Sequence, residues 1–89
     1  KGALWENFLI SERLKQNKYK ETFAKMYFWR TKQKQEIDFV EENEDGIVGY
    51  EFKWKAKKNQ RLPETFVKAY NAKTEIIDRD NFRKFVTIK

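Results

Sequence analysis

The segment EIDFVEENEDGIVGYEFKW, residues 36–54, predicts a β-hairpin, and this hairpin decides the fold. Two runs rich in β-branched and aromatic residues, 36–42 and 47–54, are typical of strands. Residues 43–46 between them have turn chemistry, and Gly46 can adopt a positive φ. A turn that is symmetric about its centre then sets the register of the two strands.

This register places Asp38 opposite Glu51 and Glu36 opposite Lys53. It also pairs Ile37 with Phe52, Phe39 with Tyr50 and Val40 with Gly49. Because strand side chains alternate, we expect one apolar face, made of Ile37, Phe39, Val48, Tyr50, Phe52 and Trp54. The other face would carry the four charged residues, with Gly49 leaving open space beside them. Opposed Cβ atoms lie ~4.5–5.5 Å apart, so the two carboxylates could share one cation.

The remaining elements complete a small α/β domain. Helical spacing of apolar residues predicts helices over 3–17, with Asn17 as its stop, and over 62–72. Short apolar runs predict strands over 26–31, 74–77 and 85–88. The expected order is αβββαββ: a single domain over residues 1–89 with a mixed five-stranded sheet and one helix on each face. The strand at 74–77 should run parallel to the one at 47–54.

Composition excludes several kinds of site. The 89 residues contain no cysteine and no histidine, which excludes disulfides, Cys/His zinc sites and Ser-His-Asp catalysis. Carboxylates remain as the strong metal ligands, and they prefer hard cations such as Mg²⁺ and Mn²⁺. No apolar run of about 18 residues occurs, so we expect a soluble, cytoplasmic protein without a membrane span. The start at Lys1 without methionine suggests a fragment of a longer chain.

The net charge of +6 is unevenly distributed. Residues 13–35 hold eight bases and one acid, residues 36–51 hold seven acids and no base, and residues 53–61 hold five bases. An acidic segment between basic flanks suits a site for polyanions, because carboxylates hold a cation while lysines attract phosphate. Candidate nucleic-acid contacts are Arg30, Lys32, Lys34, Lys55, Lys57 and Lys58. The alternative is that these runs are solvated faces.

Two carboxylates and a lysine are the components of metal-assisted phosphodiester hydrolysis. Asp38 and Glu51 would bind the metal, and Lys53 would orient the nucleophile or stabilise the transition state. Glu6 on the preceding helix could add a ligand or a proton acceptor. The alternative is a surface hairpin with an ion pair between Glu36 and Lys53. The tryptophans could stack bases, although core positions suit them better.

Four ordered blocks carry a family resemblance: GALWENF at 2–8, YFWR at 27–30, EIDFV at 36–40 and YEFKW at 50–54. The chain resembles the C-terminal domain, of unknown function, that follows the P-loop module in prokaryotic AAA-type ATPases. It is similar to the PD-(D/E)XK nuclease-like superfamily, whose three-layer, restriction-endonuclease-like fold has an αβββαβ core. By motif position, Asp38 is similar to the metal-binding aspartate, Glu51 and Lys53 match (D/E)-x-K, and Glu6 matches the helical glutamate.

The resemblance implies a Mg²⁺- or Mn²⁺-dependent nuclease acting on nucleic acid, above all DNA. It implies as partner an N-terminal AAA-type ATPase domain of the same protein, since this sequence lacks a Walker A motif. Many superfamily members keep the fold without catalysis. The alternatives are therefore a silent module that binds nucleic acid or a partner and regulates the ATPase, or a basic domain with merely structural carboxylates.

Overall fold

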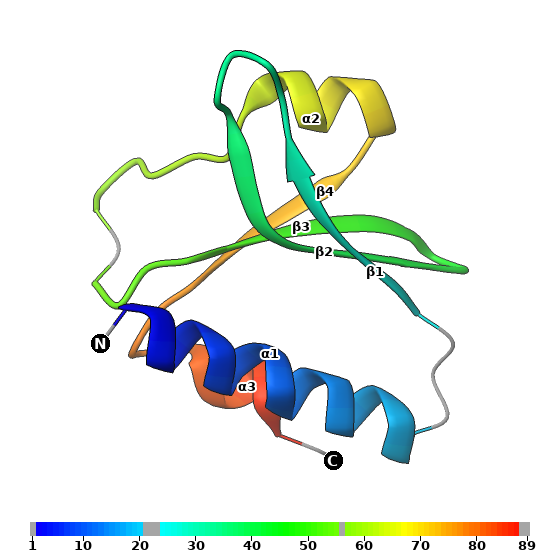
Figure 1. Cartoon of the computed structure of the whole chain (residues 1–89), viewed down its shortest axis with the longest axis vertical. Coiled ribbons are helices and arrows are strands. Elements are labelled where there is room, and N and C mark those ends of the chain that lie inside the picture. The colour runs from blue at the N-terminus through cyan, green and yellow to red at the C-terminus, as the bar shows by residue number, and fades with distance from the viewer. Residues whose placement is uncertain (1, 21–23, 56, 88–89) are drawn as a thin grey trace.

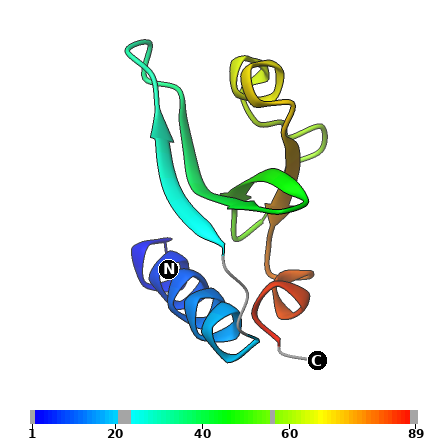
Figure 2. The ribbon, with the colours of Figure 1, turned by 90° about the vertical axis from the view of Figure 1, so that its right-hand side faces the viewer.

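The computed structural model describes residues 2–20, 24–55 and 57–87 of the chain. Its elements are α1 (Gly2–Tyr19), β1 (Lys25–Arg30), β2 (Glu36–Asn43), β3 (Gly46–Phe52), α2 (Glu64–Tyr70), β4 (Lys73–Ile77) and α3 (Phe82–Val86). The sheet lies between α2 on one side and α1 with α3 on the other (Figures 1 and 2). No helix in the described ranges is long and apolar enough to cross a membrane.

The sheet is mixed and has the order β1-β2-β3-β4. β1, β2 and β3 form the predicted antiparallel meander, and β4 pairs in parallel with β3 after the α2 crossover. The predicted hairpin register is confirmed at its centre, where Phe39 pairs with Tyr50 and Val40 with Gly49. The turn is tighter than predicted, because Asn43 and Gly46 already pair, and Gly46 has a φ of +126°.

The predicted fifth strand at 85–88 is wrong, because its described residues belong to the short helix α3 or follow it. The carboxylate of Asp78 accepts hydrogen bonds from the backbone of Asp80 and Asn81, at 2.9 and 3.0 Å. This turn starts α3, and helical spacing then directs both Phe82 and Phe85 toward the core. Two helices therefore cover one face of the sheet, where one was expected.

The core has two parts, one on each side of the sheet. Phe39, Tyr50 and Phe52 pack with α1 and α3, whereas Ile37 and Val40 pack with α2. The expected common face for Ile37 and Phe39 is therefore wrong. Tyr27 of β1 pairs with Val40 of β2, and Trp29 pairs with Ile37. Between these two pairs β1 advances by two residues and β2 by three, so β2 carries one extra residue. Such a bulge shifts the alternation of side chains along the strand.

Gly49 does not leave open space, contrary to the sequence prediction. A Cβ atom at this position would lie 2.7 Å from Cε2 of Phe66 and 3.2 Å from Cδ2 of Leu62. Phe66 is buried on α2, with 1% of its surface exposed. The missing side chain at Gly49 therefore lets α2 pack closely onto the sheet, because no larger residue would leave room for the Phe66 ring.

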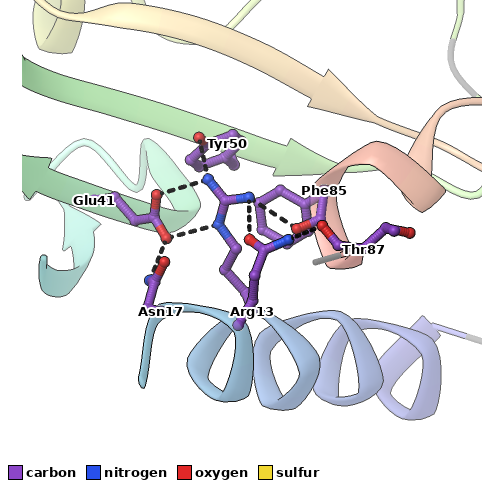
Figure 3. Close-up of polar contacts among 7 residues, drawn as sticks. Arg13, Asn17, Glu41, Tyr50, Phe85 and Thr87 are labelled. Carbon is purple, nitrogen blue, oxygen red and sulfur yellow. Dashed lines mark hydrogen bonds and ion pairs between the residues drawn. The ribbon is translucent and has the colours of Figure 1, made fainter. Parts of the chain in front are cut away.

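A buried polar cluster attaches α1 to the sheet and to α3 (Figure 3). Nε of Arg13 pairs with Oε2 of Glu41 at 2.9 Å, and Nη1 donates to the Phe85 carbonyl at 2.8 Å. Asn17 does not end the helix as predicted, because its buried side chain donates to Glu41 at 3.0 Å. Gln16 of the same helix donates to the Thr87 carbonyl. Arg13 is thus occupied inside the fold and is no phosphate contact.

Candidate catalytic and metal-binding site

Asp38 and Glu51 meet across the β2–β3 pair, beyond the last paired residues Phe39 and Tyr50. Their side-chain carboxyl groups are hydrogen-bonded to each other. Oδ2 of Asp38 also accepts a hydrogen bond from the Phe52 backbone N–H at 2.9 Å. The Asp38 side chain therefore reaches from β2 to the backbone of β3 where the bulge interrupts regular pairing. The hydrogen bond to Phe52 fixes the position of this carboxylate.

The carboxyl groups of Asp38 and Glu51 bring two negative charges together in a partly buried site. Burial, the hydrogen bond to Asp38 and the charge of Asp38 raise the pKa of Glu51 to about 7. Lys53 acts in the opposite direction, with Nζ at 3.7 Å from Oε2 of Glu51. The raised pKa of Glu51 shows that the negative charge here is held at a cost, which a bound cation would relieve.

Glu6 joins this site from α1. Its carboxyl group is partly buried, and burial followed by the negative charge of Asp38 raises its pKa, while Lys53 lowers it. The indole of Trp5 packs edge-on against that of Trp54, with ring centroids 5.3 Å apart and an interplanar angle of 87°. This contact holds the start of α1 against the chain end of β3, and so keeps Glu6 beside the other three charged residues.

The structure thus places Asp38, Glu51 and Lys53 together, and Glu6 of α1 lies near enough for the charges of Asp38 and Lys53 to shift its pKa. Among the described residues, no three acidic side chains are close enough to hold one metal ion together. The Asp38–Glu51 pair still fits Mg²⁺, which proteins often bind through one or two carboxylates while it keeps several waters. Glu6 then fits the role of a neighbouring proton acceptor better than that of a third ligand.

The ion pair between Glu36 and Lys53 that the alternative interpretation assumed does not form. Glu36 bonds Arg30 at 3.0 Å, and Lys53 bonds Glu51. The carboxylate pair is therefore not part of the simple surface hairpin that the alternative interpretation assumed. The lysine that accompanies it remains half exposed, with 46% of its side-chain surface accessible, so it can still meet a phosphate from solvent.

The candidate phosphate contacts lie on two exposed connections. Lys55, Lys57 and Lys58 follow Lys53 in the segment between β3 and α2, and all three are exposed. Lys32 and Lys34 are exposed in the β1–β2 turn, and Arg30 at the end of β1 shares its charge with Glu36. The first connection follows Lys53 directly and the second precedes β2, so each adjoins in sequence a strand that carries a site carboxylate.

Sequence reasoning missed two functional features. The core prediction for the tryptophans is confirmed for Trp5 and Trp29, but Trp54 is 39% exposed, and its contact with Trp5 beside the site was not foreseen, although each adjoins a site residue in sequence. The second is an apolar groove of about 390 Å³ beside β1 and α2. Successive side chains of a strand point to opposite faces of the sheet, so three consecutive aromatic residues cannot all face the core. The run Tyr27–Phe28–Trp29 was therefore the sequence signal for aromatic surface outside the core.

Comparison with known proteins gives one match. The sequence model of the family described as a domain of unknown function (DUF4143) matches residues 1–87, and the chain therefore belongs to this family. Neither a curated protein nor a solved structure matches the chain. The family description names no activity, so function has to be argued from the site itself.

Proposed function

We propose that this member of the family is a Mg²⁺-dependent phosphodiesterase that acts on nucleic acid. The observation that carries the proposal is the Asp38–Glu51 pair with Nζ of Lys53 at 3.7 Å from Glu51, and with Glu6 of α1 near enough to feel the charges of Asp38 and Lys53. Four positions that match a nuclease motif in sequence have no structural need to converge. The proposal includes the finer fold assignment, restriction-endonuclease-like, and the setting, an AAA-type ATPase with this domain at its C-terminal side.

Asp38 and Glu51 would hold the metal, with Asp38 already fixed by its bond to the Phe52 backbone. When bound, Mg²⁺ supplies Lewis-acid chemistry by lowering the pKa of water and polarising phosphoryl oxygens. Lys53 has no lone pair to give as an ammonium, so it would contact a phosphate oxygen and stabilise the charge that develops there. The raised pKa of Glu6 suits a group that accepts a proton from the attacking water.

The basic edges would bring the polyanion to this site. Lys55, Lys57 and Lys58 on one side and Lys32 and Lys34 on the other are exposed, and the chain has a net charge of +6. Binding of this kind is sequence-independent and depends strongly on salt, because each phosphate contact releases counterions. We expect weak binding of duplex DNA that falls steeply between low and physiological salt. Affinity that does not change with salt would contradict this part of the proposal.

The deciding experiment is a cleavage assay of the intact protein on single- and double-stranded DNA with Mg²⁺ or Mn²⁺. Glu51→Gln and Asp38→Asn should each abolish cleavage, because they remove the charge that holds the metal. Glu64→Gln is the matched control, since Glu64 is an exposed glutamate on α2 and should leave cleavage unchanged. Cleavage that persists undiminished in the Asp38→Ala, Glu51→Ala double variant would refute the assignment.

Absence of cleavage with every substrate and metal would also overturn the enzymatic assignment. If salt-dependent binding of DNA persisted in that case, the silent-module alternative would hold, and the carboxylate pair would serve structure alone. Calorimetric titration with Mg²⁺ separates the two outcomes independently of substrate, because only the first requires the metal to bind at Asp38 and Glu51.

A further inference from the structure

The groove beside β1 lies away from the carboxylate pair and has no role in the proposed chemistry. It is lined by Tyr27, Phe28, Trp29, Val40, Glu42, Ile47, Phe66 and Tyr70. Its volume of about 390 Å³ falls in the range of roughly 300–1,000 Å³ that is usual for ligand pockets. In the described sheet β1 is an edge strand, and α2 lies on the side of the sheet that the groove occupies (Figures 1 and 2).

The aromatic rings of the groove are arranged on a rigid base. Trp29 packs edge-on against Phe66 with centroids 5.3 Å apart, and Phe66 contacts the ring of Tyr70 at 5.4 Å. Outside this base, Phe28 is 58% exposed and Tyr70 is 49% exposed. Exposed rings held by buried ones offer flat faces to planar ligands, and such surfaces bind successive bases of single-stranded nucleic acids.

The charges around the groove fit an extended polyanion. Residues 24–35 contain four bases and no acid, and Lys25 and Arg30 stand at the two ends of β1. The guanidinium of Arg30 lies over the Phe28 ring, 5.3 Å from its centroid. Inside the groove, Glu42 accepts a hydrogen bond from the Tyr27 hydroxyl at 2.8 Å. This carboxylate repels phosphate from the interior, so a strand would place its bases inward and its backbone along the basic rim.

β1, which lines the groove, pairs with β2, the strand that carries Asp38. Trp29 of β1 pairs with Ile37 of β2, and Tyr27 pairs with Val40, so Asp38 lies on β2 between these two pairs. A strand that followed β1 would run one strand spacing, about 4.8 Å, from the chain that carries Asp38. The groove nevertheless lies on the α2 side of the sheet and is lined by none of the four proposed site residues, so binding there and chemistry at the carboxylate pair are separate steps.

We propose that the groove between β1 and α2 binds single-stranded DNA, with bases stacked on Phe28 and Tyr70 and phosphates along Lys25 and Arg30. The choice of nucleic acid as the ligand rests on the proposed function. The choice of DNA likewise follows from the proposed function, since the groove is lined by apolar and polar side chains alike. The groove would then hold a single strand, whereas the metal site would act on it.

The test is the fluorescence anisotropy of a labelled oligothymidine titrated with the intact protein at low salt, in EDTA. Phe28→Ala and Tyr70→Ala should each weaken binding about tenfold or more, because each removes one stacking ring. Phe28→Tyr keeps the ring and should restore the affinity. Phe8→Ala is the matched control, since Phe8 is 46% exposed on α1, across the sheet, and should change affinity by less than about twofold.

Working without divalent metal separates this proposal from the nuclease assignment. Asp38→Asn should abolish cleavage but leave the affinity for oligothymidine within about twofold, so either proposal can fail alone. Wild-type affinity in both alanine variants, with unchanged melting temperatures, would overturn the groove assignment. A duplex or an oligouridine that binds as tightly as oligothymidine would overturn the choice of single-stranded DNA. No binding by the unmodified protein would overturn it as well, and would leave the groove to a polypeptide.

Discussion

Magnesium binding at the Asp38–Glu51 pair should weaken about tenfold when the pH is lowered from 8 to 6. In the free protein the pKa of Glu51 is raised to about 7, chiefly by burial and then by its hydrogen bond to Asp38. A carboxyl group with a raised pKa is protonated below that pKa, and the proton has to leave before the metal can bind. The affinity for the metal is therefore highest well above pH 7 and falls progressively as the pH drops through about 7.

The magnitude follows from competition between one proton and the metal. With a pKa of about 7, the protonated fraction of Glu51 is about nine-tenths at pH 6 and about one-tenth at pH 8. The free carboxylate is thus about ten times scarcer at pH 6, which gives the tenfold change in affinity. By the same argument, binding should release about 0.9 proton at pH 6 and about 0.1 at pH 8.

Isothermal titration calorimetry measures both quantities. Mg²⁺ is titrated at each pH in two buffers of different ionisation enthalpy, and the difference in heat gives the number of protons released. Glu51→Gln should bind Mg²⁺ more weakly and without proton release, whereas Glu64→Gln on α2 should behave as the unmodified chain. An affinity that is the same at pH 6 and pH 8, or binding without proton release at pH 6, would refute the shared-proton site.

Three further outcomes are expected from single substitutions. Glu41→Ala should lower the free energy of unfolding by about 3 kcal/mol in urea melts, because it removes the buried carboxylate that the partly buried Arg13 and Asn17 both bond, whereas Glu12→Ala in an exposed pair should cost about 1 kcal/mol or less. Gly49→Ala should cost about 1–3 kcal/mol in the same melts, because its Cβ would lie 2.7 Å from the buried Phe66 ring; unchanged stability would contradict that packing. Lys53→Met should leave Mg²⁺ affinity nearly intact by calorimetry but slow cleavage about 10²-fold or more, and unimpaired turnover would contradict its role at the phosphate.

The comparison of prediction with structure shows where local sequence is sufficient. The hairpin and its register were predictable, because turn chemistry at 43–46 and alternation on both sides constrain the same pairing. The parallel placement of β4 was predictable too, since a helix between two strands nearly always returns the chain in that direction. These elements suffice to bring Asp38 and Glu51 together, which is why the candidate site could be identified from sequence.

Packing between distant segments decided the rest. The segment at 85–88 has a strand-like pattern, yet Phe85 lies in α3. Its ring packs against Phe39 of β2 and against Tyr50 and Phe52 of β3. The position of the bulge in β2 likewise depends on how β1 pairs with it. Neither outcome is encoded within one strand or helix, because each depends on contacts between residues that lie far apart in sequence.

The sequence by itself determined which residues could do chemistry, since the lack of histidine and cysteine left only carboxylates and lysines for the site. Only the tertiary structure decided which of these charged side chains are free to meet a metal ion or a substrate. Arg13 and Glu41 are 28 positions apart and neutralise each other inside the fold, whereas Glu51 lies beside Asp38 with only a nearby, half-exposed lysine to offset the two negative charges. Charge runs in a sequence do not distinguish these cases, because burial and partner distance set the energy of an ionised group.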